Sequence, residues 1–281
     1  MERTILHCDL NNFYASCECL LDPTLRDKPV AVCGREEDRH GIVLAKNYHA
    51  KKYGVATAEP VWQAKSKCPE LVIVPPRYDI YVKYSKIVKN IYYQYTDKVE
   101  GFGLDECWLD ISGKKVDEAE GVRIANEIRE RVKSETGLTI SVGVSFNKVF
   151  AKLGSDMKKP DAVTAITRNG FREQIWGLPA SSLLGVGRET KKLLDRYFID
   201  TIGKIATMPR DFFEKRLGKL GVQLWTYANG EDDSPVLRSE DHESAKSFGH
   251  GTTTPKDLTD NASVWDTILE LTQDISESLR T

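Results

Sequence analysis

Apolar runs and amphipathic segments alternate along the first 167 residues. Short apolar runs with β-branched residues predict strands at 4–10, 30–34, 41–45, 71–76, 138–145 and 162–166. Apolar residues at helical spacing, often ended by glycine or proline, predict helices at 13–21, 78–96, 116–137 and 147–159. Residues 170–228 show only helical patterns. This order predicts a layered domain of the α/β or α+β class, followed by a helical region.

The last fifty residues carry little pattern. "NGEDDSPV" (229–236) has the composition of a linker, "KSFGHGTTT" (246–254) predicts a strand, and 261–280 predicts one amphipathic helix. One strand and one helix cannot bury a core of their own. We therefore expect the segment after the linker to be an incomplete domain.

Charge is uneven along a chain whose formal net charge is −2. Residues 168–232 carry eleven basic and eight acidic side chains, whereas 233–281 carry four and ten. The middle segment is compatible with a polyanionic partner, although charge alone does not demand one.

The placement of the cysteines and the hydropathy of the chain indicate the cellular compartment of the protein. All six cysteines lie within residues 8–107, and none forms a CxxC pair, which favours reduced thiols in the cytoplasm over a zinc ribbon or disulfide framework. The N-terminal residues do not resemble a signal peptide, and no apolar run reaches the ~20 residues of a membrane span. These observations predict a cytoplasmic protein without membrane association.

Acidic residues follow or interrupt two apolar strands. Asp9 ends the first strand, and Asp105 and Glu106 interrupt "FGLDECWLDIS", which reads as a hairpin. Each acid alone fits a helix cap or an exposed turn. Buried carboxylates need partners, however, and three of them suit Mg²⁺, which prefers oxygen ligands. Two such ions can hold the attacking and leaving oxygens of a phosphoryl transfer.

Adjacent residues of a regular strand face opposite sides of the sheet. Asp105 and Glu106 can therefore share a site only where the strand is irregular. Gly101 and Gly103 precede them and predict such a bend.

Basic residues and glycines offer contacts for phosphate. Tyr48 and Lys51 are three apart on a short predicted helix and so share a face. Lys159 follows another helix, where it could equally complement the helix dipole. "LLGVGRETKK" (183–192) places two glycines before a basic helix, an arrangement that suits a DNA backbone but also a plain turn.

Four motifs together carry a family resemblance. "CDLNNFYASCE", "AKNYHAKKYGV", "GLDECWLDIS" and "SFNKVFAKLGSDMKKP" resemble, in order and spacing, the motifs of Y-family translesion DNA polymerases of the DNA polymerase IV type. "LLGVG" is similar to the family's helix-hairpin-helix. The resemblance runs from residue 3 to about residue 255.

The resemblance implies an α+β, right-hand polymerase core with a mixed palm sheet and a helical thumb. The implied domains are a palm at 1–11 and 78–167, fingers at 12–77, a thumb at 168–232, a linker at 233–245 and a partial little finger at 246–281.

It also implies roles for individual residues. Asp9, Asp105 and Glu106 match the catalytic metal ligands for two Mg²⁺ ions, joined by the carbonyl of Leu10. Tyr14 matches the aromatic gate that excludes a ribose 2′-hydroxyl. The remaining implied contacts are Phe13, Tyr48, Lys51 and Lys159 for the triphosphate substrate, and Gly185, Gly187 and Lys191 for DNA.

The sequence departs from the family pattern at several positions. Lys51 stands where arginine is more common, so triphosphate is held by a point charge instead of a bidentate fork. Gly103 replaces a usual serine, and Leu44-Ala45 replaces a frequent Ala-Thr pair. Only the first strand and helix of the little finger are expected within 246–281, which predicts weak, salt-sensitive DNA binding.

The resemblance implies template-directed, low-fidelity DNA synthesis in damage tolerance. Primer-template DNA and dNTPs are the expected partners, together with a sliding clamp for the complete protein. Two alternatives remain open: a palm-fold nucleotide cyclase, and a non-catalytic DNA-binding accessory protein. The gate residue Tyr14 and the "LLGVG" motif argue against the first, and the intact set of three acids argues against the second.

Overall fold

The computed structural model describes residues 3–34, 41–113, 116–241 and 246–280. Two compact units divide the chain, one of residues 1–13 with 78–240 and the other of 14–77 with 241–281. The domain boundaries expected inside these units stay predictions.

The first unit contains a five-stranded mixed sheet followed by a run of helices. Its sheet has the order β5-β6-β1-β7-β8, antiparallel except for the β7–β8 pair. The elements are β1 (Ile5–Leu10), α4 (Tyr78–Tyr92), β5 (Val99–Gly101), β6 (Glu106–Asp110), α5 (Glu118–Thr136), β7 (Ile140–Ser145), α6 (Lys148–Met157), β8 (Val163–Ile166), α7 (Phe171–Ile175), the 3₁₀ turn η2 (Ala180–Ser182), α8 (Arg188–Arg196), α9 (Ile202–Thr207) and α10 (Arg210–Ala228).

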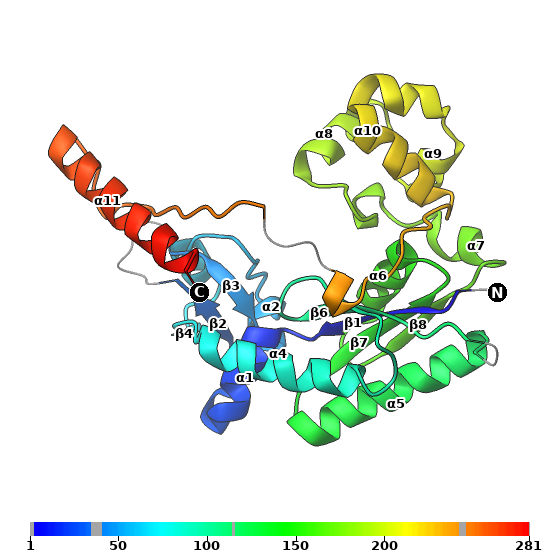
Figure 1. Cartoon of the computed structure of the whole chain (residues 1–281), viewed down its shortest axis with the longest axis horizontal. Coiled ribbons are helices and arrows are strands. Elements are labelled where there is room, and N and C mark those ends of the chain that lie inside the picture. The colour runs from blue at the N-terminus through cyan, green and yellow to red at the C-terminus, as the bar shows by residue number, and fades with distance from the viewer. Residues whose placement is uncertain (1–2, 35–40, 114–115, 242–245, 281) are drawn as a thin grey trace. The chain divides into compact units, whose positions relative to one another are not determined.

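Helices cover both faces of this sheet, with α4 and α5 on one side and α6 on the other (Figure 1). The alternation along β1 assigns its side chains to these faces. Cys8 lies on the α4 side, because its thiol bonds Tyr92, whereas His7 reaches Ser155 of α6. A continuous core then runs from Phe150 of α6 into α7–α10, so the helical region packs directly on the sheet domain.

The second unit contains a three-stranded sheet of order β3-β2-β4. Its elements are α1 (Phe13–Leu21, which begins in the first unit), η1 (Pro23–Leu25), β2 (Val30–Cys33), β3 (Val43–Lys46), α2 (Tyr48–Lys52), α3 (Val61–Lys67), β4 (Val72–Val74) and, after the short turn η3 (Ser239–Asp241), the helix α11 (Asn261–Ser278). The α+β class and the mixed sheets agree with the prediction from sequence.

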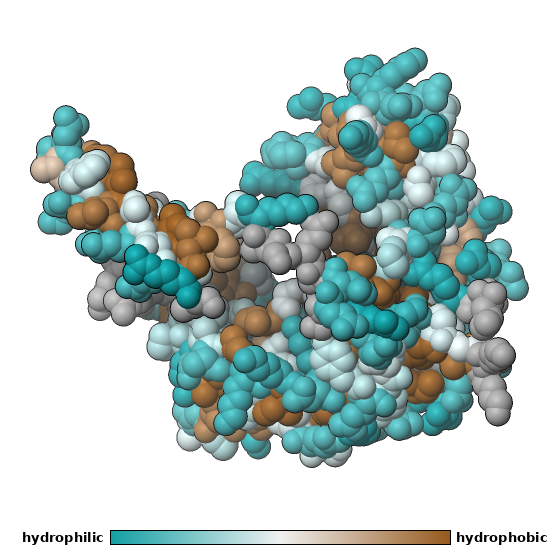
Figure 2. Space-filling view, in the orientation of Figure 1, coloured by the Kyte–Doolittle hydropathy of each residue, from teal (hydrophilic) through white to brown (hydrophobic). Residues whose placement is uncertain are grey.

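The predicted strand at 246–254 is wrong. The structure has no strand in this segment, all of which is described. Extended backbone becomes a strand only when its N–H and C=O groups pair with a neighbour, and no described strand lies beside it. The helix α11 has no buried residue, and Trp265, Ile268 and Leu269 are 65%, 49% and 47% exposed. Figure 2 shows brown, hydrophobic residues along α11 at the upper left.

No helix among the described residues is long and apolar enough to cross a membrane.

Gly143 permits an unusually close contact between β7 and α6. A Cβ at this position would lie 1.8 Å from the carbonyl oxygen of Ala151 and 2.5 Å from the backbone nitrogen of Ser155. The helix therefore rests on bare strand backbone, beside His7, whose register partner in β7 is Gly143.

We expect Gly143→Ala to lower the free energy of unfolding by about 3 kcal/mol, because the new methyl group cannot fit without moving α6. Urea unfolding followed by circular dichroism measures the change. Gly177→Ala is the matched control, since a Cβ there meets no atom within 4 Å. Equal urea midpoints for the two variants would contradict this account of the β7–α6 contact.

Candidate active site

The three acids predicted from the sequence meet at one end of the palm-like sheet. Asp9 and Glu106 are register partners on the antiparallel strands β1 and β6, so their side chains share a face. Asp105 precedes β6, and its carbonyl oxygen accepts a hydrogen bond from the backbone N–H of Leu10 at 3.0 Å. Strand pairing thus brings residues 9 and 105–106 together across about a hundred residues of sequence.

The expected irregularity before Glu106 is present. Residues 102–105 form bends between β5 and β6, and Gly103 has a left-handed φ of +90°. Asp105 therefore lies outside the regular strand and is not forced to the face opposite Glu106. The bend that the two glycines predicted is confirmed, and it lets adjacent carboxylates belong to one site.

Two lysines, one on α6 and one just after this helix, bind two of these carboxylates. The ammonium of Lys159 lies 2.7 Å from Oδ2 of Asp9 and 2.8 Å from Oδ1 of Asp156. Lys152 of α6 forms an ion pair with Oε2 of Glu106. No ammonium within ion-pair distance of Asp105 occurs in the described part of the chain.

These partners give the carboxyl groups different pKa values. Burial raises the pKa of Asp105 to about 6, and the charge of Asp9 adds to the effect. Burial also acts on Glu106, but the nearby imidazole of His7 and the ammonium of Lys152 outweigh it and hold the pKa of Glu106 at about 2. The pKa of Asp9 is raised by burial despite the charge of Lys159. Asp105 is therefore the acid whose charge is least compensated.

Another lysine of α6, Lys148, fixes this helix to the hairpin that carries Asp105 and Glu106. The ammonium of Lys148 lies 2.6 Å from Oε1 of Glu100 on β5 and 4.6 Å from the ring centroid of Trp108 on β6. The indole N–H of Trp108 donates to the backbone carbonyl of Lys148 at 2.9 Å. Glu100 also accepts a hydrogen bond from the N–H of Leu237 at 2.9 Å, which ties the segment after α10 to the hairpin.

The donor set is suited to a hard divalent cation. All three side chains offer carboxylate oxygens, two of them already hold a cationic ammonium, and the third is protonated at an unusually high pH. Among the described residues, no three His, Cys, Asp or Glu side chains are yet gathered in metal-binding geometry. Binding would therefore require the ammonium groups to yield their carboxylate oxygens.

The remaining predicted residues lie in three places. Lys51 of α2 has its ammonium 5.7 Å from the ring centroid of Tyr48, so these two share a face as predicted. Tyr14 is half-buried on α1, whereas Phe13 is buried with its ring 6.1 Å from that of Tyr81. Phe13 thus packs in the core, and its contact with substrate stays a prediction.

The "LLGVG" segment forms a tight turn before α8. Gly185 has a φ of +91°, and Gly187 is the N-cap residue of α8 with open space where a Cβ would stand. Val186 between them is buried, which anchors the turn. Lys191 is one turn into α8 and pairs with Asp195 at 2.6 Å. The turn thus exposes backbone at two glycines, as contact with a DNA strand requires.

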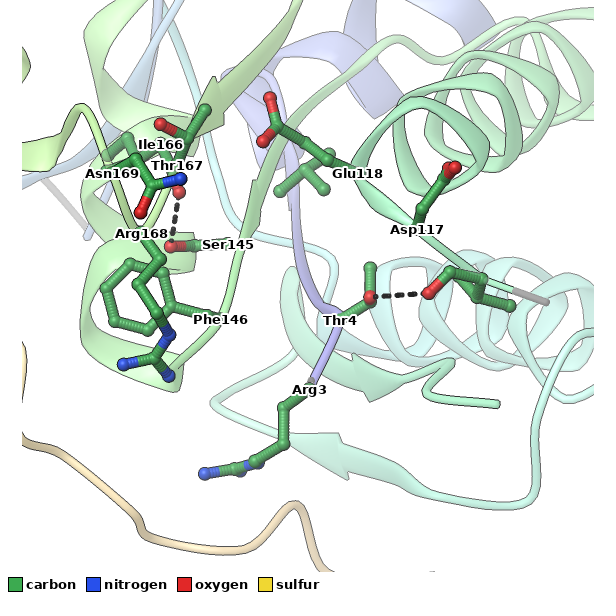
Figure 3. Close-up of a pocket in the computed structure, with 12 residues that line it drawn as sticks. Arg3, Thr4, Asp117, Glu118, Ser145, Phe146, Ile166, Thr167, Arg168 and Asn169 are labelled. Atoms are coloured by element: carbon green, nitrogen blue, oxygen red, sulfur yellow. Dashed lines mark hydrogen bonds between the residues drawn. The ribbon is translucent and has the colours of Figure 1, made fainter. Parts of the chain in front are cut away.

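A separate cavity lies away from the three acids. Figure 3 shows it at the end of β1 opposite to Asp9, with a volume of about 170 Å³. Its lining includes Arg3 and Glu118, and the guanidinium of Arg168 lies 4.1 Å from the ring centroid of Phe146. Basic and acidic groups both line it, so its charge selects no class of ligand.

Comparisons with known proteins show which family the chain belongs to. Residues 8–156 match the impB/mucB/samB family. DNA polymerase IV from Acetivibrio thermocellus is 59% identical over the whole chain, which covers 70% of that relative, and DNA polymerase IV 1 from Halalkalibacterium halodurans is 37% identical over 97% of the chain and 66% of its own length. This chain therefore spans about two thirds of the length of these relatives.

Comparison with solved structures leads to the same family. A Y-family DNA polymerase chimera, Dbh-Dpo4(243-245)-Dbh, matches 98% of this chain and 80% of its own with a TM-score of 0.88 at 26% identity. The insertion ternary complex of Dbh DNA polymerase matches 83% of this chain and 69% of its own with a TM-score of 0.77 at 27% identity. The chain therefore belongs to the impB/mucB/samB family, the Y-family of DNA polymerases, and has the right-hand polymerase architecture of its members.

Proposed function

We propose that this chain is the catalytic core of a translesion DNA polymerase, which adds dNTPs to a primer 3′-hydroxyl under the direction of a template. The primer 3′-hydroxyl loses its proton to solvent and its oxygen forms a bond to the α-phosphorus, while the bond from that phosphorus to the bridging oxygen breaks and pyrophosphate leaves. The observation that carries the proposal is the meeting of Asp9, Asp105 and Glu106 at one end of the sheet.

Asp9, Asp105 and Glu106, with the carbonyl of Leu10, would hold the divalent ions, which we assign as two Mg²⁺. Such ions supply charge stabilisation for the attacking and leaving oxygens. The protein's part is to present Asp9 and Glu106 from the paired strands β1 and β6, and Asp105 from the bend that precedes β6.

Lys159 has two alternative partners in this scheme. It bonds Asp9 at 2.7 Å in the structure, and burial opposes its charge while Asp9 and Asp156 raise its pKa. It therefore stays an ammonium throughout the physiological pH range. A triphosphate would compete with Asp9 for this ammonium, and Tyr48 and Lys51 would add further phosphate contacts from α2.

Primer extension with purified protein at low salt tests the proposal. We expect incorporation that requires a divalent ion and follows the template base. Nucleotide incorporation that ignores the template, or conversion of ATP to a cyclic nucleotide, would overturn it. The cyclase and accessory-protein alternatives find no support among the relatives. A sliding clamp remains a proposed partner of the complete protein.

Tyr14 provides a prediction about sugar selection. We expect Tyr14→Ala to increase incorporation of rNTPs relative to dNTPs by at least about 10-fold, because the ring that excludes the 2′-hydroxyl is gone. Tyr14→Phe keeps the ring and should retain selectivity for dNTPs. Steady-state insertion of paired dNTP and rNTP measures both ratios. Equal ratios for the two variants would remove Tyr14 from the role of gate.

A further inference from the structure

His7 is a buried titratable side chain that the proposed reaction does not use. It is 0% exposed, two residues before Asp9 on β1. Its Nε2 lies 3.2 Å from Oε2 of Glu106, and its Nδ1 lies 2.8 Å from the hydroxyl oxygen of Ser155 on α6. The ring also packs edge-on against Trp108, with centroids 5.1 Å apart. Contacts on three sides therefore fix the position of the imidazole.

The surroundings of the ring decide where its proton lies. A carboxylate only accepts hydrogen bonds, so the contact with Glu106 is favourable only when Nε2 carries the hydrogen. With the hydrogen on Nε2, Nδ1 is an acceptor, and the Ser155 hydroxyl 2.8 Å away can donate to it.

The other neutral tautomer is less favourable. With hydrogen on Nδ1, the Ser155 hydroxyl would donate to the backbone carbonyl of Lys152, 2.7 Å away. The lone pair of Nε2 would then face the Glu106 carboxylate at 3.2 Å. Two negative electrostatic regions would be in contact inside the protein, where water does not screen them.

The contact with Glu106 is close but imperfectly aligned. Nε2 makes no hydrogen bond of good angular geometry to any described atom, although it lies within ion-pair distance of Oε2. Among the described residues, the carboxylate of Glu106 is the ion-pair partner of that nitrogen, and it is also drawn toward Lys152. If Glu106 exchanged Lys152 for another partner, the N–H of His7 would still be in place to bind its carboxylate.

The fold explains why Ser155 reaches the ring. His7 faces α6 because alternate residues of β1 point to the same side as Asp9. Gly143, the β7 partner of His7, lets the backbone of α6 approach the sheet. The hydroxyl of Ser155 then comes within hydrogen-bond distance of Nδ1 of His7. A side chain larger than hydrogen at residue 143 would prevent this approach.

We infer that His7, oriented by Ser155, is a positioning residue that holds the Glu106 carboxylate in the orientation needed to bind the divalent ion. The inference rests on the proposed function, because it assigns Glu106 to the metal site. His7 is fully buried, so its ring does not reach a molecule bound at the surface. It acts through Glu106, as the outer partners of metal ligands do in other sites.

Mn²⁺ binding, followed by electron paramagnetic resonance in the presence of DNA and a non-reacting dNTP analogue, tests this role without turnover. We expect His7→Phe, which keeps the ring volume, to weaken Mn²⁺ binding by about 10-fold. His7→Gln restores an N–H near the place of Nε2 and should recover binding to within about 3-fold of the wild type. Ser155→Ala should weaken binding at least about 3-fold, since the ring loses its orienting bond.

Ser145→Ala is the matched control. Its hydroxyl is equally buried on β7, where it donates to the carbonyl of Ile166 at 2.8 Å, but it pairs with Ile5 at the other end of the sheet. Its Mn²⁺ affinity should equal that of the wild type.

Three outcomes are decisive. Wild-type Mn²⁺ affinity in His7→Phe, or equal losses in His7→Phe and His7→Gln, overturns the positioning role. If His7→Phe does not fold, Ser155→Ala decides, and an unchanged affinity there overturns it as well. The Mn²⁺ affinity of Glu106→Gln is measured alongside. If that variant also binds Mn²⁺ normally, the metal site itself is wrongly assigned. If Glu106→Gln is the only variant that loses Mn²⁺ affinity, the metal site stands and only the positioning role of His7 is rejected.

Discussion

Replacing Asp105 by asparagine should stabilise the metal-free protein by about 2 kcal/mol above pH 7. The folded protein raises the pKa of Asp105 from 3.8 to about 6, chiefly because burial disfavours the charged form. The folded state thus binds this proton more tightly than the unfolded state. The stability that this carboxyl contributes is present below pH 4 and is lost as the pH rises through 6. Asparagine has no proton to lose and avoids this cost.

Urea unfolding in a chelator at pH 4.5 and pH 8 measures the effect. The midpoint of Asp105→Asn should exceed that of the wild type at pH 8 and approach it at pH 4.5. Asp110→Asn on the same strand is the control with the opposite sign. Burial alone would raise the pKa of Asp110, but Ser112 and Lys98 outweigh it and lower the pKa, so Asp110→Asn should destabilise the protein at pH 8. An Asp105→Asn variant less stable than the wild type at pH 8 would contradict the assignment of an uncompensated charge.

Neutralising Glu106 should slow nucleotide addition by a factor on the order of 1,000, because metal ions contribute several kcal/mol of transition-state stabilisation. Glu106→Gln keeps the shape of the side chain but cannot neutralise a divalent ion. It also leaves Lys152 without its carboxylate partner, so the fold of the variant must be checked by circular dichroism.

Single-turnover insertion of one dNTP separates chemistry from DNA binding in this comparison. Fluorescence anisotropy should show DNA binding that is unchanged or tighter in Glu106→Gln, since a negative charge is removed. Asp110→Asn, four residues along β6, should insert at a rate within about 3-fold of the wild type. A rate for Glu106→Gln within 10-fold of the wild type would place the reaction elsewhere.

The spacing of apolar residues, and the glycines and prolines that end helices, predicted much of this fold. The apolar runs of β1 and β7 and the glycine that ends α5 are local signals, and the structure bears them out. Gly137 adopts the left-handed conformation that a helix C-cap favours. The segment 246–254 failed because pairing depends on a neighbouring strand that a local pattern cannot supply.

The acids could be found from the sequence because charges inside apolar strands are conspicuous. The groups around them could not, since their roles depend on which helix lies over β1. One signal was available: Lys148, Lys152, Ser155 and Lys159 recur at intervals of three and four along α6 and just beyond its end. A polar stripe on a helix face packed against a sheet indicates buried partners. Its partners prove to be Glu100, Glu106, His7 and Asp9.

We propose that Asp9, Asp105 and Glu106 bind the divalent ion that drives templated synthesis. The rate of single-nucleotide insertion as a function of Mg²⁺ concentration, for the wild type and Asp105→Asn at low salt, tests this role. The account predicts that the wild type inserts the complementary dNTP with a saturable Mg²⁺ dependence, while Asp105→Asn binds the same DNA and shows no insertion at any Mg²⁺ concentration. Insertion by Asp105→Asn at the wild-type rate and with the wild-type Mg²⁺ dependence would contradict it.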